Sequence, residues 1–110
     1  NMNAANLDRV DMNNANLTGS RLSNLDLRKT ILYGSNFSEC DLTDSNLSKL
    51  NLIDSNFSNA ILRNANLSNA ILKRCNFKNA DLDGANLTNA TLEDALYMDM
   101  ARNLDTVVGF

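Results

Sequence analysis

Large apolar residues recur at every fifth position along most of the chain, from Met2 to Leu92. The residue two places earlier is mostly small, as at Ala65 and Ala85, and the residue immediately before is Asn or Asp in 14 of the 19 repeats. A period of five fits neither an α-helix, with 3.6 residues per turn, nor a long strand, with a period of two. The pattern instead predicts short extended pieces, each with two inward residues, separated by corners.

The corners are predicted at the position two residues after each large apolar residue. Asn and Gly tolerate positive φ, and they recur there: Asn14, Gly19, Asn24, Gly34, Asn59, Asn64, Asn69, Asn79, Gly84 and Asn89. The chain contains no proline, which agrees with hydrogen bonds between successive coils that need the backbone N–H. We therefore predict a solenoid whose sides are single pentapeptides.

The aromatic residues indicate how many sides one coil has. Phe37, Phe57 and Phe77 are spaced by 20 residues, and the same spacing extends to Leu17 and Tyr97. Rings can stack at the spacing of adjacent strands, about 4.8 Å, only if they lie on one side of the solenoid. This predicts four pentapeptides per 20-residue coil, a square cross-section, and a core ladder of Leu17, Phe37, Phe57, Phe77 and Tyr97.

These repeats resemble the pentapeptide-repeat family, whose motif is A(D/N)LXX. The stretches Ala65–Asn69 and Ala85–Asn89 match the motif directly, and the resemblance covers about residues 1–95. It implies an all-β fold, a right-handed quadrilateral β-helix. It also implies a choice of functions, since the family includes gyrase-protecting quinolone-resistance proteins, cyanobacterial and thylakoid-lumen proteins, and bacterial effectors delivered into host cells.

The C-terminal segment departs from the repeat. Leu92, Leu96, Met100 and Leu104 follow one another at a spacing of four, and acidic residues precede Arg102, as in a helix aligned with its dipole. A solenoid must also cover its open end. We therefore predict a β-helix over residues 1–97 and a short capping helix over about 98–104, within a C-terminal segment 98–110. The uncapped N-terminal end suggests either missing sequence or end-to-end association, and the apolar tail 107–110 suggests contact with a following domain of a larger bacterial protein.

Inward positions also carry departures from the repeat. Leu25, Leu50 and Val10 replace the small inward residue, which we interpret as local filling of the core. Cys40 and Cys75 occupy the same repeat position, but they fall on different stacks nearly two coils apart. A disulfide needs Cα atoms within about 7 Å, so both are predicted to be buried free thiols.

One outward face carries apolar residues where the family pattern has polar ones. Ile31, Tyr33, Ile53 and Ile71 share this face, whereas Ile61 lies on a neighbouring face. Two interpretations remain open. The residues are either ordinary β-branched surface of a sheet or a small contact patch for a partner or a second copy.

The composition excludes several kinds of chemistry. The chain has no His, and so lacks the usual triad base and imidazole metal ligand. Acidic pairs such as Asp41 with Asp44, or Asp81 with Asp83, are interpreted as solvated surface, and no glycine-rich phosphate loop or metal-ligand spacing is present. A convex rod offers no concave site. We therefore predict a protein that is not an enzyme, with no catalytic residue, metal, cofactor or small-molecule substrate.

The charge pattern bears on the choice of partner. The formal net charge is −3, from 10 basic and 13 acidic residues, and both signs are interleaved on each predicted face. This argues against direct nucleic-acid binding and against close imitation of DNA by an acidic rod. No apolar run is long enough to span a membrane.

Three functions remain. The first is a non-enzymatic interaction or scaffold module that presents flat β-faces to a protein partner or to a second copy, with Ile31, Tyr33, Ile53 and Ile71 as the candidate contact residues. The second is a gyrase inhibitor or protector of the DNA-mimic type, and the third is a structural spacer. We expect a cytoplasmic location, and leave a secreted effector or an organelle-lumen protein as alternatives.

Overall fold

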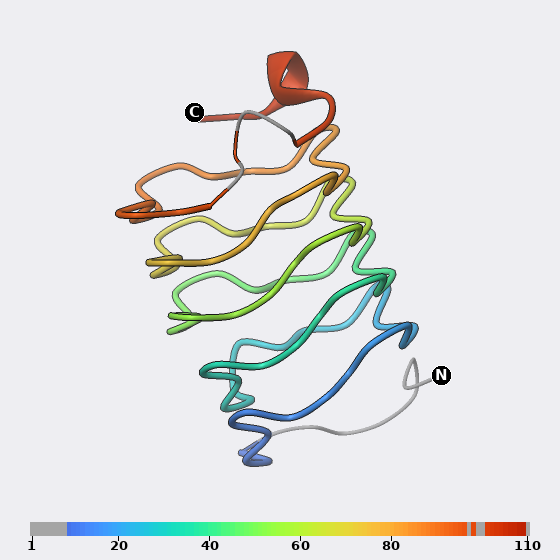
Figure 1. Cartoon of the computed structure of the whole chain (residues 1–110), viewed down its shortest axis with the longest axis vertical. Helices are drawn as coiled ribbons and strands as arrows, with labels where there is room; N and C mark the ends of the chain where they lie inside the picture. The colour runs from blue at the N-terminus through green and yellow to red at the C-terminus, as the bar shows by residue number, and fades with distance from the viewer. Residues whose placement is uncertain (1–8, 97, 99–100, 110) are drawn as a thin grey trace.

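The chain forms a rod of stacked coils. The computed structural model describes residues 9–96, 98 and 101–109. Figure 1 shows successive coils lying above one another along the long axis, from the N-terminal end in blue to the C-terminal end in red. The extents are 33 × 22 × 22 Å. The two equal short axes agree with four sides of equal length.

Parallel bridges between residues 20 positions apart hold the coils together. They fall into four columns, which begin with Asp11↔Ile31, Asn16↔Asn36, Arg21↔Asp41 and Asp26↔Asn46. Each side therefore contributes one bridge residue per coil, and the described residues form isolated bridges rather than longer strands. The predicted coil of four pentapeptides is confirmed.

The corners explain both Asn-rich positions of the repeat. All ten Asn and Gly residues predicted at corners have positive φ, and so do Arg9, Glu39, Lys49 and Arg74 at equivalent positions. The Asn or Asp before each large residue caps the same corner by accepting a backbone N–H two residues later, a local turn typical of these side chains. Ser68 N–H donates to Asn66 Oδ1 at 3.0 Å in this way.

Leucine and phenylalanine fill the interior of the rod. Phe37, Phe57 and Phe77 are fully buried, and their rings stack with centroid separations of 4.9 and 5.4 Å and nearly parallel planes. Leu17, one coil below Phe37, is also buried. Tyr97, the predicted upper end of this ladder, lies outside the described residues.

The C-terminal helix predicted over about 98–104 is not confirmed. Arg102 instead forms a parallel bridge with Asp81, and Val108 forms one with Asn86. Between them lies a single 3-10 turn, η2, Leu104–Thr106, seen at the top of Figure 1. The bridge partners are 21 and 22 residues apart instead of 20, so extra residues enter the coil. The described residues 101–103 are not helical, and residues 99–100 of the predicted helix lie outside the described residues. The extra residues break the period of five beyond Leu96.

Candidate functional site

The apolar patch, which we define as Ile31, Tyr33, Ile53 and Ile71, lies along one side of the rod. Ile31, Tyr33 and Ile71 are 46, 38 and 39% exposed, and Ile53 is half-buried. Ile31 and Ile71 belong to the same column of bridges. Ile61 is 39% exposed but belongs to a neighbouring column, with Asp41 and Asp81. The structure thus brings the four predicted residues onto one side of the rod.

Ion pairs lie beside the apolar patch. Arg74 Nε donates to Asp54 Oδ1 at 2.6 Å, linking two successive coils next to Ile53. Lys73 Nζ lies 3.6 Å from Glu93 Oε1. The hydrogen bond from Arg74 holds the pKa of Asp54 below its usual value, with a smaller contribution from the Tyr33 hydroxyl. The patch therefore has an apolar centre and a charged rim, the usual anatomy of a protein contact surface.

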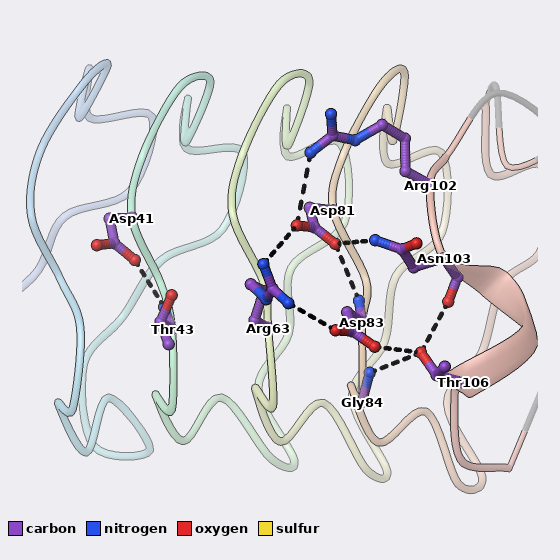
Figure 2. A network of polar contacts seen from close by, with 9 residues as sticks. All are labelled: Asp41, Thr43, Arg63, Asp81, Asp83, Gly84, Arg102, Asn103 and Thr106. Atoms are coloured by element: carbon purple, nitrogen blue, oxygen red, sulfur yellow. Dashed lines mark hydrogen bonds and ion pairs between the residues drawn. The ribbon is translucent and has the colours of Figure 1, made fainter.

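A network of carboxylates lies on the neighbouring side (Figure 2). Asp81 is only 4% exposed, so the interpretation of this residue as solvated surface is wrong. Its Oδ1 accepts a hydrogen bond from Asn103 Nδ2 at 2.8 Å, and its Oδ2 lies 3.5 Å from Arg102 Nη2. Two residues of the C-terminal segment therefore cover it.

Asp83 extends the same network. Arg63 Nη2 lies 2.8 Å from Asp83 Oδ2, and Thr106 Oγ1 lies 2.7 Å from Asp83 Oδ1. The Thr106 hydroxyl also accepts the N–H of Gly84 at 2.9 Å. Figure 2 shows these side chains reaching from three levels of the rod toward one another. The network thus attaches the C-terminal segment to the coil below it.

The electrostatics of Asp81 favour a structural role. Burial alone would raise its pKa, but the hydrogen bond from Asn103, the backbone N–H of Asp83 and the guanidinium groups of Arg63 and Arg102 outweigh burial and lower the pKa. A carboxylate held in its charged form by so many donors is a poor general acid or base near neutral pH. Asp41 lies two coils below Asp81 in the same column and caps its own corner by accepting Thr43 N–H at 3.0 Å.

The two cysteines are free and buried. Each thiol donates to a backbone carbonyl 23 residues earlier in the chain, Cys40 Sγ to Leu17 O at 2.8 Å and Cys75 Sγ to Leu52 O at 2.9 Å. Burial raises the pKa of Cys75 to about 12. A thiol with so high a pKa is almost entirely protonated at neutral pH and is a weak nucleophile.

Metal-binding clusters and membrane-spanning helices are both absent from the described residues. No group of three or more His, Cys, Asp or Glu side chains is arranged to hold a metal ion among them. In the same part of the chain, no helix has the length and apolarity needed to cross a bilayer.

The 20-residue coil assigns Arg63 to the same face as Asp81 and Asp83, whereas Arg102, Asn103 and Thr106 were not predicted to join them. The 20-residue spacing of Arg63 and Asp83 was a usable signal, because residues 20 apart lie one coil above the other. The other three residues follow the insertion that breaks the period. Their positions could not be read from the repeat.

The repeats of this chain are similar to those of a known protein family. The family model described as pentapeptide repeats matches residues 1–34, 20–59 and 60–96, with 8 copies. No curated protein matches the chain.

Solved structures similar to this chain are also pentapeptide-repeat proteins. One from the Arabidopsis thaliana thylakoid lumen is 28% identical with a TM-score of 0.74, over 77% of this chain and 59% of that protein. One from Nostoc PCC 7120 is 29% identical with a TM-score of 0.63, over 94% of this chain and 78% of that protein. The chain therefore spans less than two thirds of the thylakoid-lumen protein. Such neighbours imply a right-handed quadrilateral β-helix for this chain.

Proposed function

The chain belongs to the pentapeptide-repeat family, and from this premise we propose that it is a non-enzymatic interaction module that presents the apolar patch to a protein partner. The observation that carries the proposal is the exposure of Ile31, Tyr33 and Ile71 on one side of the rod, beside the pairs Asp54–Arg74 and Lys73–Glu93.

The scaffold suits such a role. Parallel bridges on the other three sides of the rod and the stacked rings in the core fix the distance between successive coils, so the patch residues are held in place before a partner binds. A preformed surface loses little conformational entropy on association. A second copy of the chain is the other partner that this surface fits, and the experiment below separates the two.

The gyrase-protector alternative has less support from the surface. Arg63 and Arg74 each pair with an acidic residue one coil away, so the described surface alternates in charge and does not form a continuous acidic face of the kind that imitates DNA. A supercoiling assay with added gyrase tests it directly. Inhibition or protection at stoichiometric amounts of the chain would favour this alternative over ours.

Cellular location is a separate part of the proposal. We propose the cytoplasm of a bacterial cell. Fractionation of cells that express the natural gene, with detection of the chain in the lumen of an organelle or in the medium, would favour the alternatives of a lumenal protein or a secreted effector.

Affinity capture with a matched control tests the interaction. The patch variant replaces all four patch residues by threonine: Ile31→Thr, Tyr33→Thr, Ile53→Thr and Ile71→Thr. Threonine is β-branched, so the variant removes apolar surface but keeps a residue type that suits a sheet. The control is Ile61→Thr, because Ile61 and Ile71 are equally exposed at 39% on different sides.

We expect the patch variant to lose a partner that wild type and Ile61→Thr both retain. Loss of self-association in sedimentation, with no other protein captured, identifies a second copy as the partner. Equal capture by all three proteins would leave the spacer function as the better account.

A further inference from the structure

The stack of coils is interrupted at one place on the patch side, between residues 30–32 and 50–52. On this column the bridges Asp11↔Ile31, Asn51↔Ile71 and Ile71↔Thr91 are formed, whereas Ile31 and Asn51 do not pair. Ile31 N–H donates to Val10 O at 3.0 Å and Ile71 N–H donates to Leu50 O at 2.9 Å, but no backbone hydrogen bond joins Leu32 N–H to Asn51 O. We call this interruption the ladder gap.

Packing at the small inward position explains the ladder gap. Thr30 and Leu50 occupy this position in successive coils and are both buried, whereas higher coils have Ala70 and Ala90 there. A leucine alone is tolerated, because Leu25 also replaces a small residue and its coil keeps the bond from Asn46 N–H to Leu25 O at 2.8 Å. The gap occurs where leucine meets a branched residue.

The corner beside Thr30 is also irregular. Lys29 is the only corner residue between Arg9 and Asp94, all of them in the described part of the chain, that lacks a positive φ. The turn that ends at Leu50 is stretched, with 3.4 Å between Leu50 N and Leu47 O. Both coils are therefore deformed on the two sides of the gap.

A cavity of about 390 Å³ opens at the ladder gap. Its apolar lining comes from Ile31, Leu32 and Leu50, and its polar lining from Asn13, Thr30, Tyr33 and Asn51. No charged side chain lines it. A volume of this size falls within the range of small-molecule pockets, about 300–1,000 Å³.

The hydrogen bonds around the cavity define what a ligand must offer. Asn13 Oδ1 accepts Tyr33 N–H at 2.8 Å, and Asn51 Oδ1 accepts Ile53 N–H at 3.2 Å. Each amide therefore has its oxygen engaged, and neither Nδ2 group donates to another described residue. Two N–H₂ donors beside an apolar lining match a ligand with an uncharged acceptor.

We propose that the ladder gap is a binding site for a small uncharged molecule with an apolar body and a carbonyl group. The apolar body lies against Leu32 and Leu50, and the carbonyl oxygen accepts from the amide of Asn51. The site shares Ile31 and Tyr33 with the apolar patch, but a ligand enters between two coils while a partner covers the outward side chains.

Nuclear magnetic resonance titration of the full chain tests the proposal with three probes. Acetophenone carries both required features, ethylbenzene lacks the carbonyl, and benzoate carries a charge. We expect saturable shifts of the amides of residues 30–33 and 50–51 with acetophenone, and affinities at least about threefold weaker for the other two probes. The absence of saturable shifts at these residues, or a preference for benzoate, would overturn the proposal.

Leu50→Ala locates the site, and Leu25→Ala is its matched control. Alanine at position 50 restores the residue found in the coils above, so the gap should close and exchange of the Leu32 amide with solvent should slow. We expect affinity for acetophenone to fall about tenfold or more in Leu50→Ala and to stay near wild type in Leu25→Ala. Equal affinity in wild type and Leu50→Ala would show that binding occurs elsewhere.

A second variant leaves the packing unchanged. Asn51→Asp removes the N–H₂ donor but keeps an acceptor for Ile53 N–H, as Asp41 does for Thr43. Acetophenone should bind several-fold more weakly to this variant, while the affinity for ethylbenzene stays the same. Unchanged acetophenone binding would refute the assigned role of the amide, whatever the behaviour of Leu50→Ala. Neither result depends on the capture of a protein partner.

Discussion

The stacked phenylalanines allow a quantitative test of the coil. Phe57 lies between two rings, with centroids 4.9 Å from Phe37 and 5.4 Å from Phe77. Replacement by leucine, the commonest residue at this repeat position, keeps an apolar side chain in the core and removes the ring contacts. The perturbation therefore isolates the stacking from the hydrophobic pattern.

The expected magnitude follows from the number of ring contacts. A stacked aromatic pair is worth about 0.5–1.5 kcal/mol beyond area burial. Phe57→Leu removes two pairs and should lower the free energy of unfolding by about 1–3 kcal/mol. Phe37→Leu removes one described pair, so its cost should be about half as large.

Double-mutant cycles in urea measure the coupling. Phe37→Leu combined with Phe57→Leu should give a coupling energy of about 0.5–1.5 kcal/mol. Phe37→Leu combined with Phe77→Leu is the control, because Phe57 separates these rings, and the two effects should add within about 0.5 kcal/mol. Equal coupling in both cycles, or none between Phe37 and Phe57, would refute the assignment of these residues to consecutive coils.

Three further predictions concern the corner, the carboxylate network and the thiols. Asn66→Ala should destabilise the chain by about 1 kcal/mol through loss of the bond from Ser68 N–H, whereas Asn66→Asp should be nearly neutral; equal losses in urea unfolding would contradict this. The folded pKa of Asp81 is lowered, so the stabilisation by its charged form is present above about pH 4 and is lost below it. The difference in unfolding free energy between wild type and Asp81→Asn should therefore shrink on acidification. A constant difference down to pH 2 would oppose the account. The Cys75 thiol, with a pKa of about 12, should resist thiol reagents at neutral pH until urea unfolds the chain, and rapid labelling of folded protein would argue otherwise.

The period of five was sufficient to predict the coil. The backbone geometry repeats every five residues, and Asn14 or Gly84 at a corner indicates the positive φ that the turn requires. Glu39 and Arg74 adopt the same φ without the preference of Asn or Gly. Bonds between coils impose this conformation on them, so these corners follow from the repeat and not from the residue.

The helix predicted for the C-terminal segment is not confirmed, and the described residues give a reason. A spacing of four between apolar residues is typical of a helix, but Leu104 belongs to the 3-10 turn η2, and Arg102 extends the coil. The extra residues shift the phase of the repeat. Only the positions of Asp81 and Asn103 in space reveal that the segment is attached by hydrogen bonds.

The sequence predicts which residues share the patch side, but not the ladder gap between them. The repeat assigns Ile31, Tyr33, Ile53 and Ile71 to one side, because alternation along a five-residue unit determines which side chains point outward. The ladder gap depends on how Thr30 and Leu50 pack in successive coils and on the turn at Lys29. Such packing depends on three-dimensional shape, which a one-dimensional pattern does not contain.

Photo-cross-linking from single positions tests the central claim that the patch is the contact surface. Benzoylphenylalanine would replace Tyr33 or Ile71 on the patch, and Ile61 as the control on the neighbouring side, in full-length protein expressed in its own cells. We predict that Tyr33 and Ile71 cross-link to the same protein, identified by mass spectrometry, and that Ile61 does not. Cross-links from Ile61 alone, or equally from all three positions, would contradict the account.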